Sequence, residues 1–269
     1  MKSEVSVIMG IYNCEKTLPA AVSSILNQTY SDLCLVMCDD ASTDGTYAVA
    51  LDFQKRYPEK IILLRNAQNM GLAFSLNRCL EHAESPYIAR MDADDESCPM
   101  RIEEEMAYLH AHPDVDCVGT LLVVFDEHGE HGVRAQAEFP NAAGIVRRMP
   151  FFHPTIVMKK TVYDTLGGYT VAPDTVRAED ADLWFRFFAA GFRGYVLQKP
   201  LYRYRVSENA ARSKRRLAYA LKTARVYSRG YRLLHLPIWK QIYALRPIVS
   251  ALLPDKFMYF YHKRKIQNG

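Results

Sequence analysis

Four short apolar runs alternate with helical segments in the first hundred residues, and this alternation restricts the fold more than any other feature of the chain. The runs are residues 5–10, 33–38, 61–64 and 86–91. The segments between them carry apolar residues at helical spacing, such as Leu72, Leu76 and Leu80. Strands that alternate with helices in this way form a parallel, doubly wound sheet. We therefore expect an α/β fold with a Rossmann-like, mostly parallel sheet flanked by helices.

Polar residues follow three of these strands. They are Tyr12-Asn13, Asp39-Asp40 and Asp92-Asp94-Asp95. Because ligands of doubly wound sheets bind outside the carboxyl ends of the strands, these residues should meet at one edge of the sheet. Ordinary solvated loop acids have no reason to gather on the same edge, so the convergence indicates a candidate site.

The sequence DADD, residues 92–95, places three carboxylates on four consecutive positions directly after an apolar run. Like charges at this spacing repel one another, and burial without a partner raises their pKa values. A bound cation removes the conflict, and Mg²⁺, Mn²⁺ and Ca²⁺ prefer carboxylate oxygens. A solvated acidic turn is the simpler explanation for this tetrapeptide taken alone, so the metal site depends on the other motifs.

The pattern changes after residue 113. The apolar run 115–125 predicts one long strand or a strand pair, and residues 153–160 predict a short strand. The segment that starts at Glu179 begins with acids, continues with apolar residues on one face, and stops at Gly191. Asp180 should therefore lie at or just before a helix N-terminus, where an ordinary N-cap is the alternative to a functional role.

The cysteines and the N-terminus indicate a compartment. The six cysteines are scattered without C-x-x-C spacing, which argues against zinc and suits a reducing cytoplasm. Cys34 and Cys38 share one face of a predicted strand and should be buried. The N-terminal residues MKSEVSVIMG run straight into a strand, so we expect no signal peptide, and we find no apolar run long enough to span a bilayer.

Six motifs, in order, resemble glycosyltransferase family 2, whose members are inverting enzymes of the GT-A fold that use nucleotide-sugar donors. The motifs are VSVIMGIYN, CDDASTDGT, NMGLAFSLNRCLEHA, RMDADD, HPT and EDADLW. The resemblance spans about residues 3–206. It implies that RMDADD is an Asp-x-Asp metal motif for Mn²⁺ or Mg²⁺, that HPT belongs to the acceptor side, and that EDADLW holds the catalytic base.

The resemblance implies a role for each matching residue. Asp180 would be the general base for the acceptor hydroxyl, and Asp92 and Asp94 would bind the divalent ion. Glu179 and His153 would orient or contact the acceptor, although His153 could instead be a buried histidine bonded to backbone, and Asp182 should be structural. The residues expected at the nucleotide, with Tyr12 stacked on the base, are Ile11, Tyr12, Asp40, Asn69, Asp92 and Ala93.

Two positions depart from the family pattern. Gly10 stands where the family often has proline or threonine, and Ser207 stands where many members carry a histidine. If that histidine helps to hold the diphosphate or the metal in relatives, another cation must do so here. The candidates are Arg205, Arg212 and Lys214.

Three other functions compete with glycosyl transfer. A sugar-1-phosphate nucleotidyltransferase would need a glycine-rich, basic phosphate loop after the first strand, where this chain has MGIYNCEKTL. A glycosidase needs two carboxylates facing a sugar but has no use for a nucleotide-binding edge. A non-catalytic scaffold for a membrane or a partner would have no reason to keep both the DADD and the ED motifs.

The overall charge of +4 hides an asymmetry between two parts of the chain. Residues 201–269 carry 16 Lys and Arg but 2 acids, a net +14, whereas residues 1–200 carry 18 bases and 28 acids, a net −10. Bases alternate with aromatic residues along 207–269, and residues 214–234 and 255–265 predict helices. This pattern is typical of a helix lying in a membrane interface. The alternatives are packing on the acidic domain or a homodimer contact.

These expectations combine into one hypothesis. Residues 1–206 form the GT-A catalytic domain, with a nucleotide-sugar half (1–112) and an acceptor half (113–206), and residues 207–269 form a basic tail on an anionic membrane surface. The chain moves a sugar from a nucleotide-diphosphate sugar, expected to be a UDP-sugar, to a lipid-linked saccharide acceptor in cell-surface polysaccharide synthesis. We expect it in the cytoplasm, on the inner face of the cell membrane, with no nucleic-acid partner.

Overall fold

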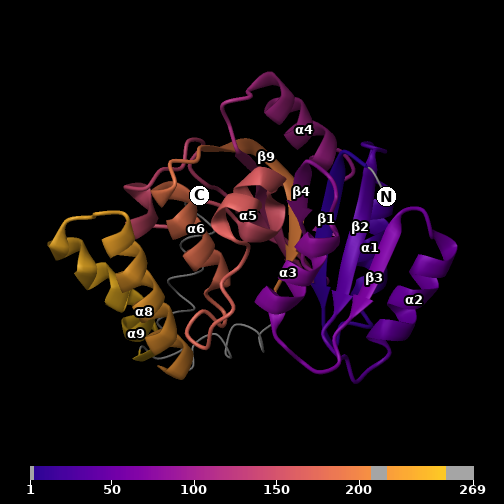
Figure 1. The fold of residues 1–269 in the computed structure, drawn as a ribbon, viewed down its shortest axis with the longest axis horizontal. Helices are drawn as coiled ribbons and strands as arrows, with labels where there is room; N and C mark the ends of the chain where they lie inside the picture. Colours follow the sequence, from indigo (N-terminus) through magenta and orange to yellow (C-terminus); the bar gives the residue numbers. More distant parts are fainter. Residues whose placement is uncertain (1–2, 207–216, 253–269) are drawn as a thin grey trace.

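The computed structural model describes residues 3–206 and 217–252 of the chain. Within these residues, one sheet of nine strands has the order β3-β2-β1-β4-β8-β6-β9-β5, and β7 pairs with β6. Figure 1 labels β1 to β4 and β9 of this sheet. The strands are β1 (Val5–Ile11), β2 (Leu33–Asp39), β3 (Ile61–Arg65), β4 (Tyr87–Arg90), β5 (Glu96–Ser97), β6 (Cys117–Asp126), β7 (Gly129–Arg134), β8 (Val157–Lys159) and β9 (Gly194–Arg205).

Helices cover both faces of the sheet, which gives the molecule two apolar cores. The α-helices are α1 (Leu18–Leu26), α2 (Thr46–Arg56), α3 (Leu72–His82), α4 (Arg101–Ala111), α5 (Lys160–Leu166), α6 (Glu179–Ala189), α8 (Leu217–Leu233) and α9 (Arg246–Leu252). The 3₁₀ helices are η1 (Gly144–Val146), η2 (His153–Thr155) and η3 (Ile238–Leu245). Residues of α1, α2 and α4 fill one core, and residues of α3, α5, α6 and α8 fill the other.

The N-terminal half confirms the prediction of a parallel, doubly wound sheet. β1 pairs in parallel with both β2 and β4, and β2 pairs in parallel with β3. Every residue of β2 is buried because both of its faces are covered. Cys34 and Cys38 lie in the core beside α3, as predicted. The carboxyl ends of β1, β2 and β4 therefore share one edge, which carries the polar residues identified in the sequence.

The second half of the sheet is mixed, and it contains the elements that the sequence patterns did not predict. β8 is antiparallel to both β4 and β6, whereas the long strand β9 is parallel to β6. The short strand β5, directly after the acids, pairs with the end of β9. The HPT motif forms the turn η2 and not the start of a strand, since β8 begins only at Val157.

The helix predicted within residues 214–234 is present as α8, and it packs on α6. The ring of Phe185 in α6 lies 5.8 Å from Tyr227 and 5.6 Å from Tyr231, centroid to centroid. Arg229 adds ion pairs of 2.9 Å to Asp174 and 3.2 Å to Asp182. Packing on the acidic domain is therefore what the structure shows for α8. The helix predicted over 255–265 lies outside the described residues.

No helix within residues 3–206 or 217–252 combines the length and the apolar character that a bilayer crossing requires.

Gly230 should be essential for the docking of α8. A Cβ atom at this position would fall 2.2 Å from Cγ of Phe185, a side chain that is 1% exposed and has no room to move. Although alanine favours helix by about 1 kcal/mol, overpacking in a full core typically costs about 1–3 kcal/mol or more. We expect Gly230→Ala to lower the free energy of unfolding in urea, whereas Arg225→Ala on the exposed face should leave it unchanged. Equal stability of the two variants would contradict this docking.

Candidate active site

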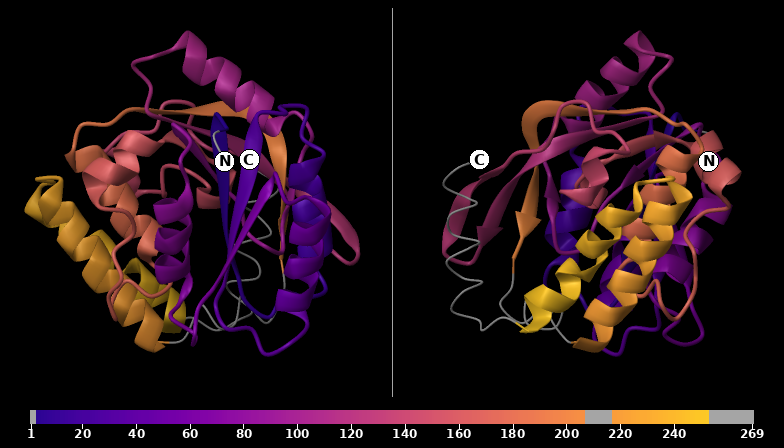
Figure 2. Two further views of the ribbon diagram at one scale, coloured as in Figure 1. Left: turned by 45° about the vertical axis from the view of Figure 1, so that its right-hand side comes forward. Right: turned by 90° about the vertical axis from the view of Figure 1, so that its left-hand side faces the viewer.

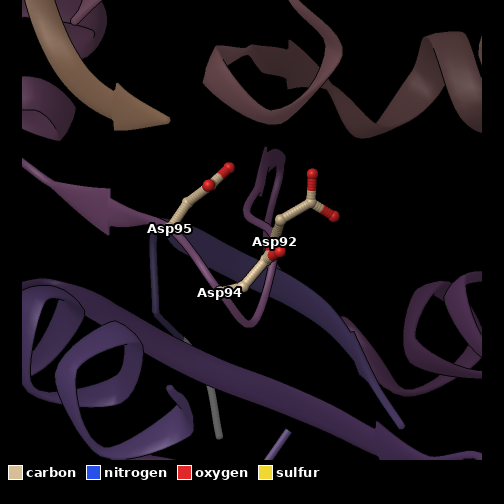
Figure 3. Close-up of side chains that lie close together, drawn as sticks. All are labelled: Asp92, Asp94 and Asp95. Carbon is tan, nitrogen blue, oxygen red and sulfur yellow. The ribbon is translucent and has the colours of Figure 1, made fainter. Parts of the chain in front are cut away.

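The three carboxylates of the DADD motif lie together on the turn that follows β4 (Figure 3). One oxygen from each of Asp92, Asp94 and Asp95 lies within 4.8 Å of the other two. Asp94 is exposed, Asp92 is partly exposed and Asp95 is buried. The sequence prediction that these acids gather at a strand end is consistent with this geometry.

Asp95 has an unsatisfied oxygen that a cation would satisfy. Its Oδ1 accepts a hydrogen bond of 2.7 Å from the backbone amide of Arg205, but its buried Oδ2 makes no hydrogen bond of normal geometry with the described residues. Burial, together with the charges of Asp92 and Asp94, raises the pKa of this carboxyl well above its ordinary value. Three carboxylates with oxygens within 4.8 Å of one another form a donor set that fits Mn²⁺ or Mg²⁺.

Arg90, the last residue of β4, lies buried beneath this turn and was missed in the sequence. Its Nη1 lies 2.5 Å from Oδ1 of Asp92, and its side chain is 4% exposed. Burial opposes the charge of Arg90, but the charge and hydrogen bond of Asp92, together with Tyr169 and Tyr202, outweigh burial, so the pKa of the guanidinium is raised. A charged residue inside a strand with buried neighbours was the available signal.

Glu179 and Asp180 are the first two residues of α6, and Ala178 is the N-cap. The alternative that Asp180 is an ordinary N-cap is therefore wrong. Oδ1 of Asp180 accepts a hydrogen bond of 2.7 Å from the amide of Ala181. Burial, followed by the charge of Asp180, raises the pKa of Glu179 from its ordinary 4.5 to about 7.

The two acidic groups influence each other electrostatically. Arg90 lowers and Asp92 raises the pKa of Glu179, which places both sides of the site within electrostatic reach. His153 forms a 2.8 Å hydrogen bond between its Nε2 and the hydroxyl of Tyr169. Burial and the charge of Arg90 lower the pKa of His153 well below its ordinary value, so this histidine is neutral. Its partner is a tyrosine and not the backbone, and a contact with an acceptor stays a prediction.

The residues expected at the nucleotide differ in how accessible they are. Tyr12 is 48% exposed directly after β1, as stacking on a base would need. Asn69 is exposed, whereas Ile11 and Ala93 are buried and can offer only backbone or a small contact surface. The contacts of Tyr12, Asn69, Ile11 and Ala93 with a nucleotide remain predictions.

Asp40 already has a structural role. Its Oδ1 accepts hydrogen bonds of 2.7 Å from Asn66 and 2.8 Å from the amide of Met70, and its Oδ2 accepts one of 2.8 Å from the amide of Gly71. The carboxylate therefore fixes the turn that starts α3. Both carboxylate oxygens of Asp40 therefore already accept hydrogen bonds from the chain itself. The predicted contact between Asp40 and a nucleotide remains a prediction.

Arg205 is the one diphosphate candidate that the described residues contain. Besides its backbone bond to Asp95, its Nε donates a 3.0 Å hydrogen bond to the carbonyl of Asp94, and its guanidinium lies 4.5 Å from the ring centre of Phe125. This places a cation directly beside the carboxylates. Arg212 and Lys214 lie outside the described residues.

Comparison with known proteins identifies the family. Residues 6–171 match the family described as glycosyl transferase family 2. EpsE of Bacillus subtilis is 44% identical over 265 residues, which cover 98% of this chain and 95% of EpsE. The chain belongs to glycosyltransferase family 2. The predicted resemblance is thereby confirmed, and the chain is a glycosyltransferase.

Other relatives of the transferase have more specific names. The O-antigen biosynthesis glycosyltransferase WbnJ of Escherichia coli is 34% identical over 80% of this chain and 84% of its own length. WfaP of Escherichia coli, named a UDP-Glc:alpha-D-GlcNAc-diphosphoundecaprenol beta-1,3-glucosyltransferase, is 35% identical over 39% of this chain and 41% of its own. The mannosyltransferase PcManGT of Pyrobaculum calidifontis, solved with GDP-Man and Mn²⁺, superposes with a TM-score of 0.68 at 20% identity, covering 97% of this chain and 80% of that one. This superposition confirms the predicted GT-A fold.

The raised pKa of Glu179 predicts a pH-dependent stability. Because the folded state holds this proton more tightly than the unfolded state, the contribution of Glu179 to stability is fully present below pH 4.5 and is lost as the pH rises through about 7. Relative to Glu179→Gln, the wild-type free energy of unfolding should therefore fall between pH 5 and 7.5, by at most about 3 kcal/mol. Urea unfolding with a chelator present measures this, and parallel pH curves for the two proteins would contradict it.

Proposed function

We propose that this transferase moves a sugar, with inversion, from a nucleotide-diphosphate sugar to a hydroxyl of a saccharide acceptor. The observation that carries the proposal is the pairing of two acidic groups across one site. The carboxylates of Asp92, Asp94 and Asp95 cluster within 4.8 Å, and the charge of Asp92 raises the pKa of Glu179, whose neighbour on α6 is Asp180. One group suits a metal and a diphosphate, and the other suits proton transfer.

Each residue would act at a stated point. The carboxylates of Asp92, Asp94 and Asp95 would hold Mn²⁺ or Mg²⁺, which when bound supplies positive charge for the leaving diphosphate. Arg205 would add a second positive charge beside it. Asp180 would take the proton from the acceptor hydroxyl, a contribution worth about 10²–10⁴ in rate. Glu179, with a pKa of about 7, would be protonated in part at neutral pH and could donate a hydrogen bond to a second hydroxyl.

The acceptor is proposed to be lipid-linked, in the synthesis of a cell-surface polysaccharide. WbnJ is named for O-antigen biosynthesis, and WfaP is named for a UDP-Glc donor and a diphosphoundecaprenol acceptor. A lipid-linked acceptor lies at a membrane, which the net charge of +14 over residues 201–269 would favour. We therefore propose a UDP-sugar donor and a peripheral location on the inner face of the cell membrane, with residues 1–206 as the catalytic domain.

The two remaining alternatives fit the site less well. A non-catalytic scaffold gives no reason to gather the carboxylates of Asp92 and Asp94 around the buried Asp95. A nucleotidyltransferase needs a basic loop after β1, but here Tyr12 and Asn13 occupy it, and Oδ1 of Asn13 accepts a 2.9 Å hydrogen bond from the amide of Thr43. This loop is held against the turn after β2 and presents the ring of Tyr12, with Lys16 as its one cation.

A donor screen tests the proposal without knowledge of the acceptor. The full chain is incubated with Mn²⁺ and a panel of nucleotide sugars, and release of the nucleoside diphosphate is measured. We expect one donor to be hydrolysed above the others and a UDP-sugar to be that donor. Hydrolysis of a different nucleotide sugar would correct the nucleotide only, whereas release of pyrophosphate from a nucleoside triphosphate and a sugar phosphate would establish the nucleotidyltransferase alternative.

A further inference from the structure

Residues 238–252 present an apolar ridge to solvent. Trp239, Ile242 and Leu245 follow one another at intervals of three in η3, where residues three apart lie above one another. Val249 and Leu252 continue the same line into α9. These five side chains, which we call the ridge, are exposed by 63%, 67%, 50%, 54% and 68%, respectively, so they are not part of either core.

The segment that carries the ridge is held in place, because its opposite side packs on the rest of the protein. Ala244 is 2% exposed and belongs to the apolar core, and Tyr243 packs against that core. Nη1 of Arg246 donates a 2.7 Å hydrogen bond to the carbonyl of Val146 in η1. The segment lies at one end of the molecule, beside α8, on the side that faces the viewer in the right panel of Figure 2.

A basic groove adjoins the ridge at Trp239. A cavity of about 730 Å³ lies between η1 and η3, and its walls include Arg147, Lys240 and Arg246 as well as Trp239 and Tyr243. Nζ of Lys240 lies 5.5 Å from the ring centre of Trp239, so a cation and an amphipathic ring stand side by side at its mouth. Residues 217–252 contain six Lys and Arg and no acid.

We propose that the ridge and the groove dock the enzyme on a bilayer that contains anionic phospholipids. The ridge would enter the headgroup layer, where tryptophan is favoured, and Arg147, Lys240 and Arg246 would bind the lipid phosphates. The proposal rests on the proposed location at the membrane and assigns the contact to η3 and α9. It moves the contact away from α8, whose aromatic residues Tyr227 and Tyr231 pack on Phe185.

Charge decides between the membrane and two other occupants of the ridge. A second copy of the chain, paired symmetrically, would bring Lys240 and Arg246 of both copies together with no acid from 217–252 between them. Residues 253–269, which follow the ridge, contain four Lys and Arg and one acid, so they would add positive charge to a basic groove. An anionic lipid surface complements both the apolar ridge and the cations.

The two tryptophans of the chain give a direct readout in the full-length protein. Trp184 is fully buried in the core, whereas Trp239 stands on the ridge. We expect the chain to sediment with vesicles of phosphatidylglycerol and phosphatidylcholine but not with phosphatidylcholine alone. Brominated lipid in those vesicles should quench the fluorescence of the wild type, and quenching should be lost in Trp239→Phe. Absence of sedimentation at low salt, or sedimentation without quenching, would overturn the proposal.

Matched variants separate the ridge and the groove from general charge. Ile242→Asp combined with Val249→Asp should reduce vesicle binding by about tenfold or more, whereas Leu221→Asp, an exposed apolar position on α8, should not. Arg147→Gln combined with Lys240→Gln should weaken binding more than Lys222→Gln combined with Arg225→Gln, which removes the same charge from α8. Equal effects within either pair would overturn the assignment to this surface.

Two further measurements keep the outcomes distinct. Without vesicles, all of these variants should release nucleoside diphosphate from a soluble donor at the wild-type rate. A wild type that binds vesicles but hydrolyses no donor would contradict the proposed function and leave the docking proposal standing. Analytical ultracentrifugation without lipid should show the same mass for the wild type and the Ile242→Asp, Val249→Asp variant. A wild-type dimer that this variant dissociates would assign the ridge to a second copy and overturn the proposal.

Discussion

Replacing Asp94 with alanine is expected to reduce sugar transfer by about 10²–10⁴-fold, because a metal that stabilises the leaving group contributes several kcal/mol to the transition state. The fold should survive the change. Asp94 is exposed on the turn after β4, and Arg205 bonds its backbone carbonyl, which alanine retains. Transfer measured over a range of Mn²⁺ concentrations, beside urea unfolding of both proteins, tests the two statements together.

The control for Asp94→Ala removes an exposed acid away from the site. Asp52 of α2 pairs on the surface with Arg56 at 2.8 Å, and such a pair contributes little to stability. Asp52→Ala should therefore keep full transfer. Wild-type activity in Asp94→Ala, or wild-type transfer that is undiminished in excess chelator, would remove the metal from the account.

Replacing Asp180 with asparagine is expected to lower kcat by about 10²–10⁴-fold, the usual contribution of a positioned general base. The affinity for the donor should not change, because the carboxylates that would hold the diphosphate are untouched. Asparagine keeps the side-chain oxygen that accepts the 2.7 Å hydrogen bond from Ala181, so the first turn of α6 should persist. Single-turnover kinetics with saturating donor separate kcat from binding.

Asp182 provides the comparison, because it lies on the same helix turn but is engaged in structure. Its Oδ2 accepts hydrogen bonds of 2.8 Å from Arg186 and 2.6 Å from Thr170, and its Oδ1 accepts one of 3.2 Å from Arg229. Asp182→Asn should lower stability, since it removes a charged partner of two arginines, with a much smaller loss of kcat. If Asp180→Asn turns over normally, Asp180 is not the base.

The N-terminal half of the fold was predictable because its signals are local. Each strand from β1 to β4 contains a compact apolar run, and the parallel arrangement brings the polar residues that follow β1, β2 and β4 to one edge. The acids at 92–95 could therefore be assigned to a site before their geometry was known. The sequence could not predict that the carboxylate oxygens of Asp92, Asp94 and Asp95 lie within 4.8 Å of one another, because this depends on the conformation of the turn after β4.

The second half was harder to predict because its contacts are distant in the sequence. The pairing of β9 with β6 joins residues such as Leu122 and Tyr202, and no local pattern records it. This strand brings Arg205 to the carboxylates, and it brings the hydroxyl of Tyr202 to within 3.2 Å of the backbone amide of Asp92. Arg90 was missed for a related reason, since its partner is recognisable only once the turn is in place.

The composition of residues 207–269 led to a membrane interpretation that was incomplete. The bases and aromatic residues of 207–269 suggested one membrane-facing unit, but α8 buries Val226 and Tyr231 in the core of the catalytic part. A chain cut at Val206 would uncover Phe185 and the core around it. The charge pattern alone could not show this, because an aromatic residue suits a protein core and a membrane interface equally well.

Calorimetric titration of the donor's nucleoside diphosphate into the full chain, with and without Mn²⁺, tests the central claim most directly. The claim is that Asp92, Asp94 and Asp95 hold a divalent ion that binds a diphosphate. The account predicts tight binding at one site when Mn²⁺ is present and a large loss of affinity when it is absent or when Asp94 is alanine. Equal affinity with and without Mn²⁺, in the wild type and in Asp94→Ala, would contradict it.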